Sequence, residues 1–397
     1  MPGREARKPF ERSCALVKLA VAAVSMSVLT AGCGQGTDAP REGLAARRDP
    51  LPGSAVSPTL TPQVSGTTRR LDSVSVVNEN VVWASGRNGT VVRTLDGGET
   101  WEVHVIPGAE TLAFRDIEAF SKDVAFVLSN NGGPNARIYK TEDGGETWTL
   151  EFQSPIVISF YDCFAFWDQH QAIAVPDGEE GHFDVLRMTD GHTWENIGDL
   201  FPPAQAGEGF FPASGTCITT RGGRLAWAVS GGAAHPRVIA TTDRGDTWTS
   251  YGIPMGGTAS SGGLSIAFRD NHHGILGGGE VAALGEFQDN NFARSSDGGK
   301  TWQLATAAPF PGPIYGLGYA KHSGGGSEGS DEVDDEDGEG HLVRIVATGV
   351  GGTAWSPDEG DTWESLPGLT GLLSVSFANP HTGWMVGIAG QIVRIDF

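Results

Sequence analysis

The sequence predicts an all-β protein, a seven-bladed β-propeller, from three observations. One short phrase, Ser/Thr-x-Asp-x-Gly-x-Thr-Trp, occurs five times, and a sixth copy that opens with Met188 is one residue shorter. The six aspartates of these copies are 47, 47, 53, 54 and 61 residues apart, a spacing typical of propellers and solenoids. The 397 residues also include 58 glycines, which suit many short strands and turns, and no long amphipathic helical pattern.

The repeated phrase is interpreted as a hairpin turn with an aromatic anchor. Asp favours turns because its side chain accepts hydrogen bonds from the backbone N–H groups that follow it. The glycine tolerates positive φ, and the tryptophan opens the next strand with a large apolar face. A catalytic or metal-binding array of aspartates is the alternative, but equivalent positions on a ring lie apart. The structural pairs are Asp96 and Trp101, Asp143 and Trp148, Asp190 and Trp194, Asp243 and Trp248, Asp297 and Trp302, and Asp358 and Trp363.

Each repeat unit is predicted to form four strands. The first comprises residues 71–77, 81–85, 91–94 and 101–105, and later units begin near Phe114, Phe160, Gly215, Gly263 and Pro313. A seventh unit begins near Leu372, and the sequence ends before its fourth strand. We expect residues 63–70 to supply that strand, because pairing the two ends closes the ring and removes a free sheet edge. A six-bladed ring is the alternative.

Residues 1–32 are predicted to be a lipoprotein signal peptide. A basic lead precedes an apolar stretch over residues 19–29, which is too short to span a bilayer. The sequence Leu-Thr-Ala-Gly-Cys then makes Cys33 the expected lipidated residue, with an ordinary secretory peptide as the alternative. Residues 33–62 are rich in Gly, Ala and Pro and are expected to be a flexible tether before a propeller over 63–397.

These features predict a cell-envelope protein that a lipid anchors to a membrane on its periplasmic side. Gly34 stands where an aspartate would favour retention at the inner membrane, so the outer membrane is preferred. The chain has 27 Lys and Arg against 48 Asp and Glu, a net charge of −21. This charge argues against binding to nucleic acid or anionic lipid and is compatible with cationic partners or with solubility alone.

An acidic, low-complexity insertion explains the long gap before the last box. Residues 323–340 read SGGGSEGSDEVDDEDGEG and are expected to be disordered. An EF-hand loop does not fit, because Val333 occupies the position of the first ligand and the terminal Glu is missing. We therefore predict no metal site, with diffuse calcium attraction as an alternative.

Two cysteines, Cys163 and Cys217, remain after the signal peptide and Cys33. Each lies nine residues before an alanine in the second strand of its unit, so they occupy equivalent positions on neighbouring inner strands. Such positions approach each other near the axis, and an oxidising envelope permits a disulfide. Two buried free thiols are the alternative.

The repeated phrase resembles the Asp-box of the bacterial-neuraminidase-type (BNR) repeat, which occurs in sialidases and in non-enzymatic propellers. The longer register resembles the photosystem II stability/assembly factor-like family, and in particular a bacterial lipoprotein branch often labelled oxidoreductase. The residues that carry this resemblance over 63–397 are 71–101, 160–168, 213–216, 265–270 and 373–397. The resemblance implies a propeller and, if the role is shared, help in membrane-protein assembly. Those factors are thought to use a basic patch, whereas this chain is acidic.

One face of the propeller is expected to bind ligands or partners. The loops into each inner strand and the loops between second and third strands share this face, and the Asp-box turns lie on the other. Mapping the sequence onto it gives a mixed polar ring, with solvated loop surface as the alternative. The candidates are Arg87, Arg115, Asp116, Tyr161, Asp162, Asp177, Glu208, Ser214, Arg237 and Glu280.

From the sequence, no residue is assigned a catalytic role. A sialidase needs an arginine cluster and a tyrosine nucleophile beside an acid, and only Tyr161 next to Asp162 suggests such a pair. The chain has no strand–GxGxxG–helix unit, CxxC pair or CxxCH site, so no cofactor is expected. We expect a monomeric, membrane-tethered propeller that binds a protein or a glycan, not nucleic acid, as an assembly or scaffold factor. The alternative is a sialidase-like glycoside hydrolase or glycan-binding protein.

Overall fold

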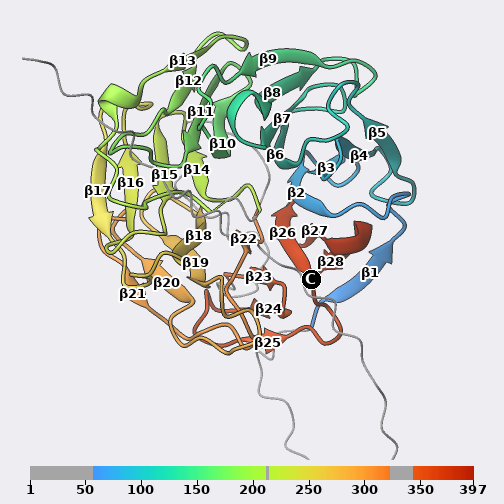
Figure 1. The fold of residues 1–397 in the computed structure, drawn as a ribbon. Coiled ribbons are helices and arrows are strands. Elements are labelled where there is room, and N and C mark those ends of the chain that lie inside the picture. Colours follow the sequence, from blue (N-terminus) through green and yellow to red (C-terminus); the bar gives the residue numbers. More distant parts are fainter. Residues whose placement is uncertain (1–56, 212–213, 322–342) are drawn as a thin grey trace, which may run out of the picture. The chain divides into compact units, whose positions relative to one another are not determined.

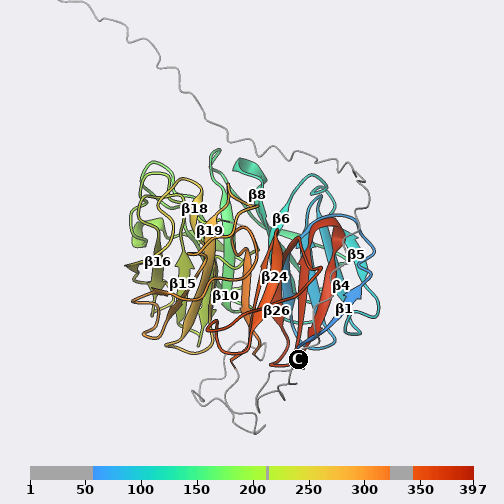
Figure 2. The same ribbon diagram turned by 90° about the horizontal axis from the view of Figure 1, so that it is seen from below.

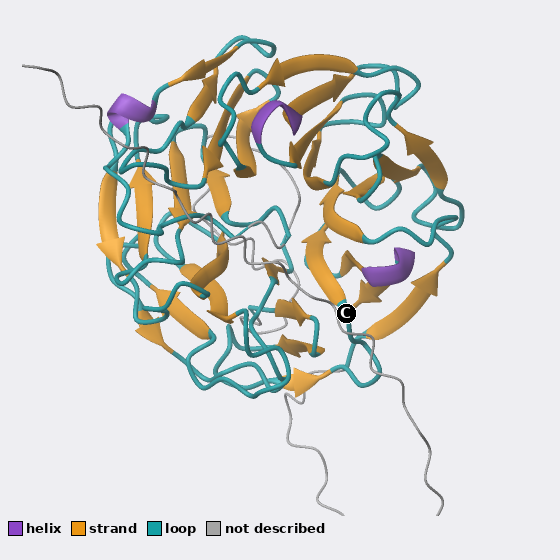
Figure 3. Ribbon diagram, in the orientation of Figure 1, coloured by secondary structure: helices purple, strands orange, loops and turns teal. Residues whose placement is uncertain are grey.

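The computed structural model describes residues 57–211, 214–321 and 343–397. The predicted signal peptide, Cys33, most of the predicted tether and the acidic insertion lie outside these residues. The described chain forms seven four-stranded antiparallel sheets around one axis, which confirms the predicted seven-bladed propeller (Figure 1). Figure 3 shows that it is almost all strand, with single-turn helices at Gly133–Asn135, Gly198–Leu200 and Ile388–Gly390. No helix in the described ranges is long and apolar enough to cross a membrane.

Each of the first three blades follows the order inner to outer strand along the chain. Blade 1 is β2 (Leu71–Val76), β3 (Val82–Gly86), β4 (Thr90–Thr94) and β5 (Glu102–Val105). Blade 2 is β6 (Phe114–Ala119), β7 (Ala125–Asn130), β8 (Ala136–Thr141) and β9 (Thr149–Gln153). Blade 3 is β10 (Tyr161–Asp168), β11 (Gln171–Pro176), β12 (Leu186–Met188) and β13 (Trp194–Asn196).

The remaining blades repeat this order until the last strand of the ring. Blade 4 is β14 (Ile218–Arg221), β15 (Leu225–Val229), β16 (Arg237–Thr241) and β17 (Thr249–Gly252). Blade 5 is β18 (Ser261–Phe268), β19 (Gly274–Glu280), β20 (Phe292–Ser295) and β21 (Gln303–Leu304). Blade 6 is β22 (Gly316–Tyr319), β23 (Ile345–Gly349), β24 (Gly352–Ser356) and β25 (Glu364–Ser365). Blade 7 is β26 (Leu372–Phe377), β27 (Thr382–Gly387), β28 (Ile392–Asp396) and β1 (Thr59–Gln63).

The hydrophobic core is divided among the contacts between neighbouring blades. Seven clusters of buried apolar side chains each join two adjacent sheets, so every interface of the ring has its own core. Inner and middle strands are buried on both faces, as in β3 and β27, whereas the outer β5 is mostly exposed. The burial of both faces explains why the middle strands read as apolar runs and not as alternating patterns.

The Asp-box turns close the third and fourth strands of six blades on one face, which we call the box face. In blade 1, Asp96 accepts hydrogen bonds from the hydroxyls of Thr94 (2.7 Å) and Thr100 (2.6 Å) and from the Thr100 N–H (2.9 Å). Four other boxes repeat these bonds around Asp143, Asp243, Asp297 and Asp358. The short box of blade 3 has Met188 where the other boxes have a Ser or Thr two residues before the aspartate, and Asp190 accepts bonds from the His192 and Thr193 N–H groups.

The ring closes through β1, which pairs antiparallel with β28 in the register Thr59↔Asp396 to Gln63↔Ile392. The predicted closure by the N-terminal segment is therefore correct, but the strand is Thr59–Gln63 and not 63–70, and it begins inside the predicted tether. Gln63 joins the two end blades, because its Oε1 accepts the indole N–H groups of Trp101 (3.2 Å) and Trp384 (3.1 Å) and its Nε2 donates to the Gly97 carbonyl (3.0 Å).

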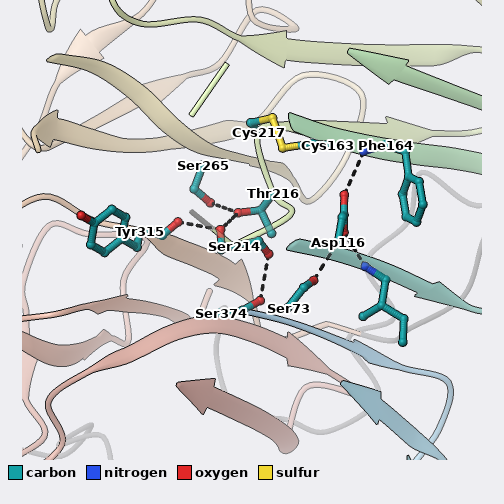
Figure 4. Close-up of a disulfide and its surroundings, with 11 residues drawn as sticks. Ser73, Asp116, Cys163, Phe164, Ser214, Thr216, Cys217, Ser265, Tyr315 and Ser374 are labelled. Carbon is teal, nitrogen blue, oxygen red and sulfur yellow. Dashed lines mark hydrogen bonds between the residues drawn. A yellow bond between two sulfur atoms is a disulfide. The ribbon is translucent and has the colours of Figure 1, made fainter. Parts of the chain in front are cut away.

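Residues 214–216, which precede Cys217 and β14, lie at the axis of the ring, and Figure 4 shows their hydrogen bonds to other blades. The Ser214 hydroxyl donates to the Tyr315 carbonyl of blade 6 (2.7 Å), and Ser374 of blade 7 donates to the Ser214 carbonyl (3.2 Å). The Thr216 hydroxyl bonds to Ser265 of blade 5 (2.7 Å). We call residues 214–216 the axial plug.

The axial plug also contacts blades 1 and 2, and the residue that follows it is bonded to blade 3. Gly215 lies so close to Asp116 and Ser73 that a Cβ on it would stand 2.2 Å and 2.8 Å from their side-chain oxygens. The next residue, Cys217, forms a disulfide with Cys163 of blade 3, with a Cα–Cα distance of 6.1 Å (Figure 4). Every blade of the ring is therefore tied to the plug or to the residue that follows it.

Gln63→Ala tests the closure of the ring. The substitution leaves the indole N–H groups of Trp101 and Trp384 without their acceptor, and an unsatisfied buried donor costs about 1–3 kcal/mol. We expect the free energy of unfolding, measured in guanidinium chloride, to fall by about 2 kcal/mol. Thr61→Ala on the exposed side of β1 is the control, and an equal effect of the two substitutions contradicts this role of Gln63.

Gly215→Ala tests the axial plug. Gly215 has φ 75° and no room for a Cβ, whereas Gly181 has φ 87° and nothing within 4 Å of a Cβ. Gly181→Ala should cost only the backbone penalty of about 1–2 kcal/mol. Gly215→Ala adds a steric clash at the axis. We therefore expect it to lower the free energy of unfolding, measured by chemical denaturation, by about 1–3 kcal/mol more than Gly181→Ala does. Equal losses would show that the axis tolerates a side chain.

Candidate binding site at the mouth of the propeller

The face opposite the box turns carries the connections between blades and the loops between second and third strands, and we call it the mouth (Figure 2). Three arginines converge there on the fully buried carboxylate of Asp72. Nitrogen–oxygen distances to Asp72 are 2.7 Å from Arg70, 3.3 Å from Arg87 and 3.8 Å from Arg115. Their side chains are 33%, 38% and 20% exposed, so this arginine cluster is open to solvent above a buried anion.

β-Bulges at the start of the inner strands aim these side chains. The register shifts by one residue between Leu71 and Ser73, between Phe114 and Asp116, and between Tyr161 and Cys163. The extra residues are Asp72, Arg115 and Asp162. A bulge bends its strand and turns one side chain out of the regular alternation. Three neighbouring blades thus place a charged residue at the same level of the mouth.

The cluster holds a surplus of positive charge. Burial lowers the pKa of Arg115 to about 10; Asp72 and Asp162 oppose this shift, and the charges of Arg87 and Arg70 add to it. Arg115 still remains protonated at neutral pH. Three guanidinium groups lie around Asp72, with Asp162 near Arg115, and this concentration of positive charge can attract a carboxylate or another anion to the mouth.

Asp162 and Asp177 form a second charged element beside the arginines. Burial raises the pKa of Asp162 well above its usual range, and the neighbouring Asp177 carboxylate adds to this effect. Asp177 is exposed as a whole residue, but desolvation of its carboxyl by the surrounding protein raises its pKa to about 6. Both groups are acceptors when ionised, so a hydrogen bond between them requires one proton on the pair.

The structure brings four predicted residues together at the mouth, namely Arg87, Arg115, Asp162 and Asp177. Sequence reasoning missed Arg70, Asp72 and Tyr315. The signal that could have found the first two is the triplet Arg70-Leu71-Asp72, which stands where Ala113-Phe114-Arg115 opens the next blade. Tyr315 occupies the corresponding position of blade 6, and its burial raises the pKa of the phenol despite the nearby Arg70 and Arg115.

Other predicted residues lie elsewhere. Asp116 and Ser214 are buried in the axis, where Asp116 accepts the N–H groups of Ile117 (2.8 Å) and Phe164 (2.9 Å). Tyr161 is 1% exposed and donates to the Asp184 carbonyl (2.9 Å), so its phenol is not open to a substrate. Glu280 stands apart at the end of β19, where Thr258 donates to it (2.8 Å).

Glu208 and Arg237 form a structural ion pair on the side of blade 4. The Nε and one terminal nitrogen of Arg237 each lie 2.8 Å from a Glu208 oxygen, and Arg237 also donates to the Pro203 carbonyl (2.6 Å). Glu208 is almost completely buried and accepts the Ser230 hydroxyl as well (2.8 Å). This pair fixes the long connection between β13 and β14, and its charged groups bond to each other and to neighbouring residues of the same blade and connection.

Metal ligands do not gather in the described ranges. Among residues 57–211, 214–321 and 343–397, no three His, Cys, Asp or Glu side chains are placed to hold one ion. The aspartates of the boxes are spread around the ring and are occupied by hydrogen bonds from their own turns. The chemistry that the mouth offers is charge recognition by the arginine cluster, beside two neighbouring carboxyls with raised pKa values.

Stability should depend on pH with an acidic maximum. The six box aspartates have lowered pKa values, about 2 for Asp96 through bonds from Thr100 and about 2 for Asp190 through bonds from Thr193 and His192. Their stabilisation is present above the unfolded pKa of about 4 and is lost as the pH falls toward 2. Burial raises the pKa of Glu118 to about 7 and that of Asp177 to about 6. Their stabilisation is present below about 4 and is lost as the pH rises through 6 and 7.

The melting temperature should therefore peak near pH 4–5 and fall toward pH 8. Glu118→Gln and Asp177→Asn should flatten the fall on the alkaline side, since a neutral amide does not titrate. Calorimetry of the wild type and the double variant across this range measures both effects. A melting temperature that is highest at pH 8 contradicts the assignment of these buried carboxyls.

Comparisons with known proteins agree with this architecture. No protein-family model matches the chain. A curated xyloglucanase from a Paenibacillus species is 33% identical over 158 residues, which covers 37% of this chain and 14% of that protein. The structure of YCF48 bound to a D1 peptide has a TM-score of 0.56 at 16% identity, covering 87% of this chain and 98% of that one.

A second YCF48 structure, from Cyanidioschyzon merolae, has a TM-score of 0.56 at 17% identity and covers 85% of this chain and 98% of that one. At such identities the likeness concerns the fold. It confirms, at that level, the predicted resemblance to the photosystem II assembly factor propellers. The chain is a seven-bladed propeller of the Asp-box type with the fold of the YCF48 structures.

Proposed function

We propose that this protein is a non-catalytic, protein-binding propeller that uses the arginine cluster of the mouth to bind carboxylate groups of a partner. The observation that carries the proposal is the convergence of Arg70, Arg87 and Arg115 on the single buried carboxylate of Asp72. A solvent-open cationic centre is unusual on a chain with a net charge of −21, so it marks a place where the surface differs from its surroundings.

The role as an assembly or scaffold factor is the finer part of the proposal. A propeller of the same fold has been solved with a peptide bound, the YCF48 structure with a D1 peptide, which supports a peptide or protein as the class of partner. The predicted lipid at Cys33 would hold the protein on a membrane of the cell envelope, and the tether would let the mouth reach membrane-protein partners. A monomer suffices for this role.

A glycoside hydrolase or glycan-binding protein is the second candidate, because a xyloglucanase shares part of this sequence. Glycosidases place two carboxyl groups about 5–9.5 Å apart on either side of the scissile bond. Asp162 and Asp177 instead lie next to each other, and Asp162 is fully buried. A sialidase-type mechanism needs an accessible tyrosine beside the arginines, and Tyr161 is buried with its hydroxyl donated to a backbone carbonyl. Tyr315 lies near Arg70 and Arg115 but is half-buried, and burial raises the pKa of its phenol, which does not favour a nucleophile. The geometry of the mouth favours binding.

Photo-crosslinking from the mouth tests the proposal. A photoreactive amino acid in place of the exposed Thr111, next to blade 2, should capture one defined protein from native membranes. Arg70→Gln and Arg87→Gln should each reduce this capture at least tenfold, because the surplus charge is lost while the side chain remains polar. Arg294→Gln is the matched control, since Arg294 on blade 5 pairs with Asp361 of blade 6 (2.7 Å) and not with the mouth.

Two results bear against the proposal. Capture that is insensitive to Arg70→Gln and Arg87→Gln removes the arginine cluster from the binding site. Release of sugar from xyloglucan or from a sialoglycoconjugate, lost in Asp162→Asn or Asp177→Asn, assigns the mouth to catalysis. Thermal melting of each variant must first show that the ring is intact.

A further inference from the structure

Large apolar side chains are exposed mainly on the mouth. Among residues 57–211, 214–321 and 343–397, eight of the 13 exposed large apolar side chains lie in the connections and loops of this face, four lie on outer strands, and one, Leu95, lies in a box turn. Scattered exposed apolar residues are normal on a protein surface, but a one-sided gathering marks an interaction surface.

Five of these residues follow one another around the rim from blade 5 to the connection before blade 1. They are Leu284 (36% exposed), Phe287 (71%), Val350 (36%), Ile388 (41%) and Val64 (87%). We call this set the apolar arc. Backbone contacts link its members in order, so the arc is one continuous path along the mouth.

The links within the apolar arc are hydrogen bonds and close backbone contacts. The Glu286 carbonyl, in the loop that carries Phe287, accepts a hydrogen bond from the Gly312 N–H (2.8 Å). The next loop packs against the same connection, since a Cβ on Gly351 would lie 2.1 Å from the Pro311 oxygen. The Val350 carbonyl accepts the Gly371 N–H (3.0 Å), and the Gly371 carbonyl accepts the Ile388 N–H (2.9 Å).

The end of the arc at Val64 is open. Residues 63–68 and 389–391 line a surface hollow of about 670 Å³ at this position. The close approach of Gly390 to the Thr67 carbonyl oxygen, 2.0 Å from a built Cβ, holds the two segments together. A side chain of a bound segment can enter the hollow beside Val64.

The two ends of the apolar arc carry opposite charge. Glu286 and Asp289 are exposed on either side of Phe287 at the blade 5 end. At the other end, the exposed Arg69 and the half-buried Arg70 follow Val64 along the chain. A molecule that covers the arc therefore meets an acidic end, an apolar middle and a basic end in that order.

We infer that the apolar arc is a docking surface for a protein segment that is apolar along its middle, basic at the end over Glu286 and Asp289, and acidic at the end over Arg69 and Arg70. This inference rests on the proposed function and adds the chemistry and the direction of the bound segment. An anionic bilayer does not fit, because it would face the acidic end as well. A second copy of this chain would bring another net charge of −21 against the mouth, which a short segment does not.

A displayed library of random peptides, selected against the full chain, tests this inference. The enriched peptides should have an apolar centre with basic residues toward one end and acidic residues toward the other. Phe287→Ser and Ile388→Ser should each weaken their binding at least tenfold, since each removes an apolar contact. Leu150→Ser is the matched control, because Leu150 is 44% exposed near the start of the outer strand β9, which begins at the box turn and not at the mouth.

Reversing the charges at the acidic end of the apolar arc tests the direction in which the peptide binds. The double variant Glu286→Lys with Asp289→Lys should lose the selected peptides, and peptides whose basic residues are replaced by Glu should bind this variant again. The absence of such sequences among the enriched peptides, or binding that ignores Phe287→Ser and Ile388→Ser, overturns the inference. If arc variants leave the crosslinked partner unchanged while Arg87→Gln removes it, the arc proposal fails and the proposed function stands.

Two other occupants give distinct readouts. Sedimentation with phosphatidylglycerol and phosphatidylcholine vesicles detects a membrane, and sedimentation equilibrium over a range of protein concentrations detects a second copy. Vesicle binding or self-association that disappears in Phe287→Ser assigns the arc to that occupant and overturns the docking of a segment.

Discussion

The axial plug is the constraint on which the rest of this propeller depends. A ring of seven sheets leaves the inner edge of every first strand facing a central channel, where backbone N–H and C=O groups lack a sheet partner. Here the Ser214 hydroxyl donates to the Tyr315 carbonyl, and the Asp116 carboxyl accepts the Phe164 N–H. Hydroxyl bonds between Thr216 and Ser265 and from Ser374 to the Ser214 carbonyl tie the plug to blades 5 and 7. Hydrogen bonds from one tripeptide thus join blades that are far apart in sequence, and the Cys163–Cys217 disulfide fixes the residue that follows it.

A filled axis moves any function to the faces of the ring. The box face is occupied by turns whose aspartates are already bonded to their own threonines, so it offers little to a partner. The mouth has both chemical features that the box face lacks, a cationic centre at Arg70, Arg87 and Arg115 and a rim of exposed apolar side chains. Charge steers a partner and sets its orientation, and apolar burial supplies affinity. The two features together describe a surface for protein recognition.

The fold was predictable because its determinants are local. An Asp-box turn is specified by a few consecutive residues, and six copies with regular spacing define the blades without knowledge of long-range contacts. The closing strand was predicted too late in the chain. The residues that precede the first repeat unit indicate that they supply a strand, but they do not indicate which of them pair with the last blade. Ser214 was expected on the surface since it precedes an inner strand, yet the long connection before β14 turns inward and buries it. Asp72 and Arg70 were missed because one-residue bulges, which no sequence period shows, decide which side chains reach the mouth.

Hydrogen exchange at the inner edges tests the closed axis most directly. The N–H of Phe164 donates to Asp116 (2.9 Å) and that of Ile266 donates to the Thr216 carbonyl (2.9 Å), although neither bond belongs to a sheet. If the axis is filled as described, both amides exchange as slowly as those of the buried middle strands β3 and β27. Exchange of Phe164 and Ile266 at the rate of exposed loop amides would show a water-filled channel and would contradict the assignment of function to the mouth surface alone.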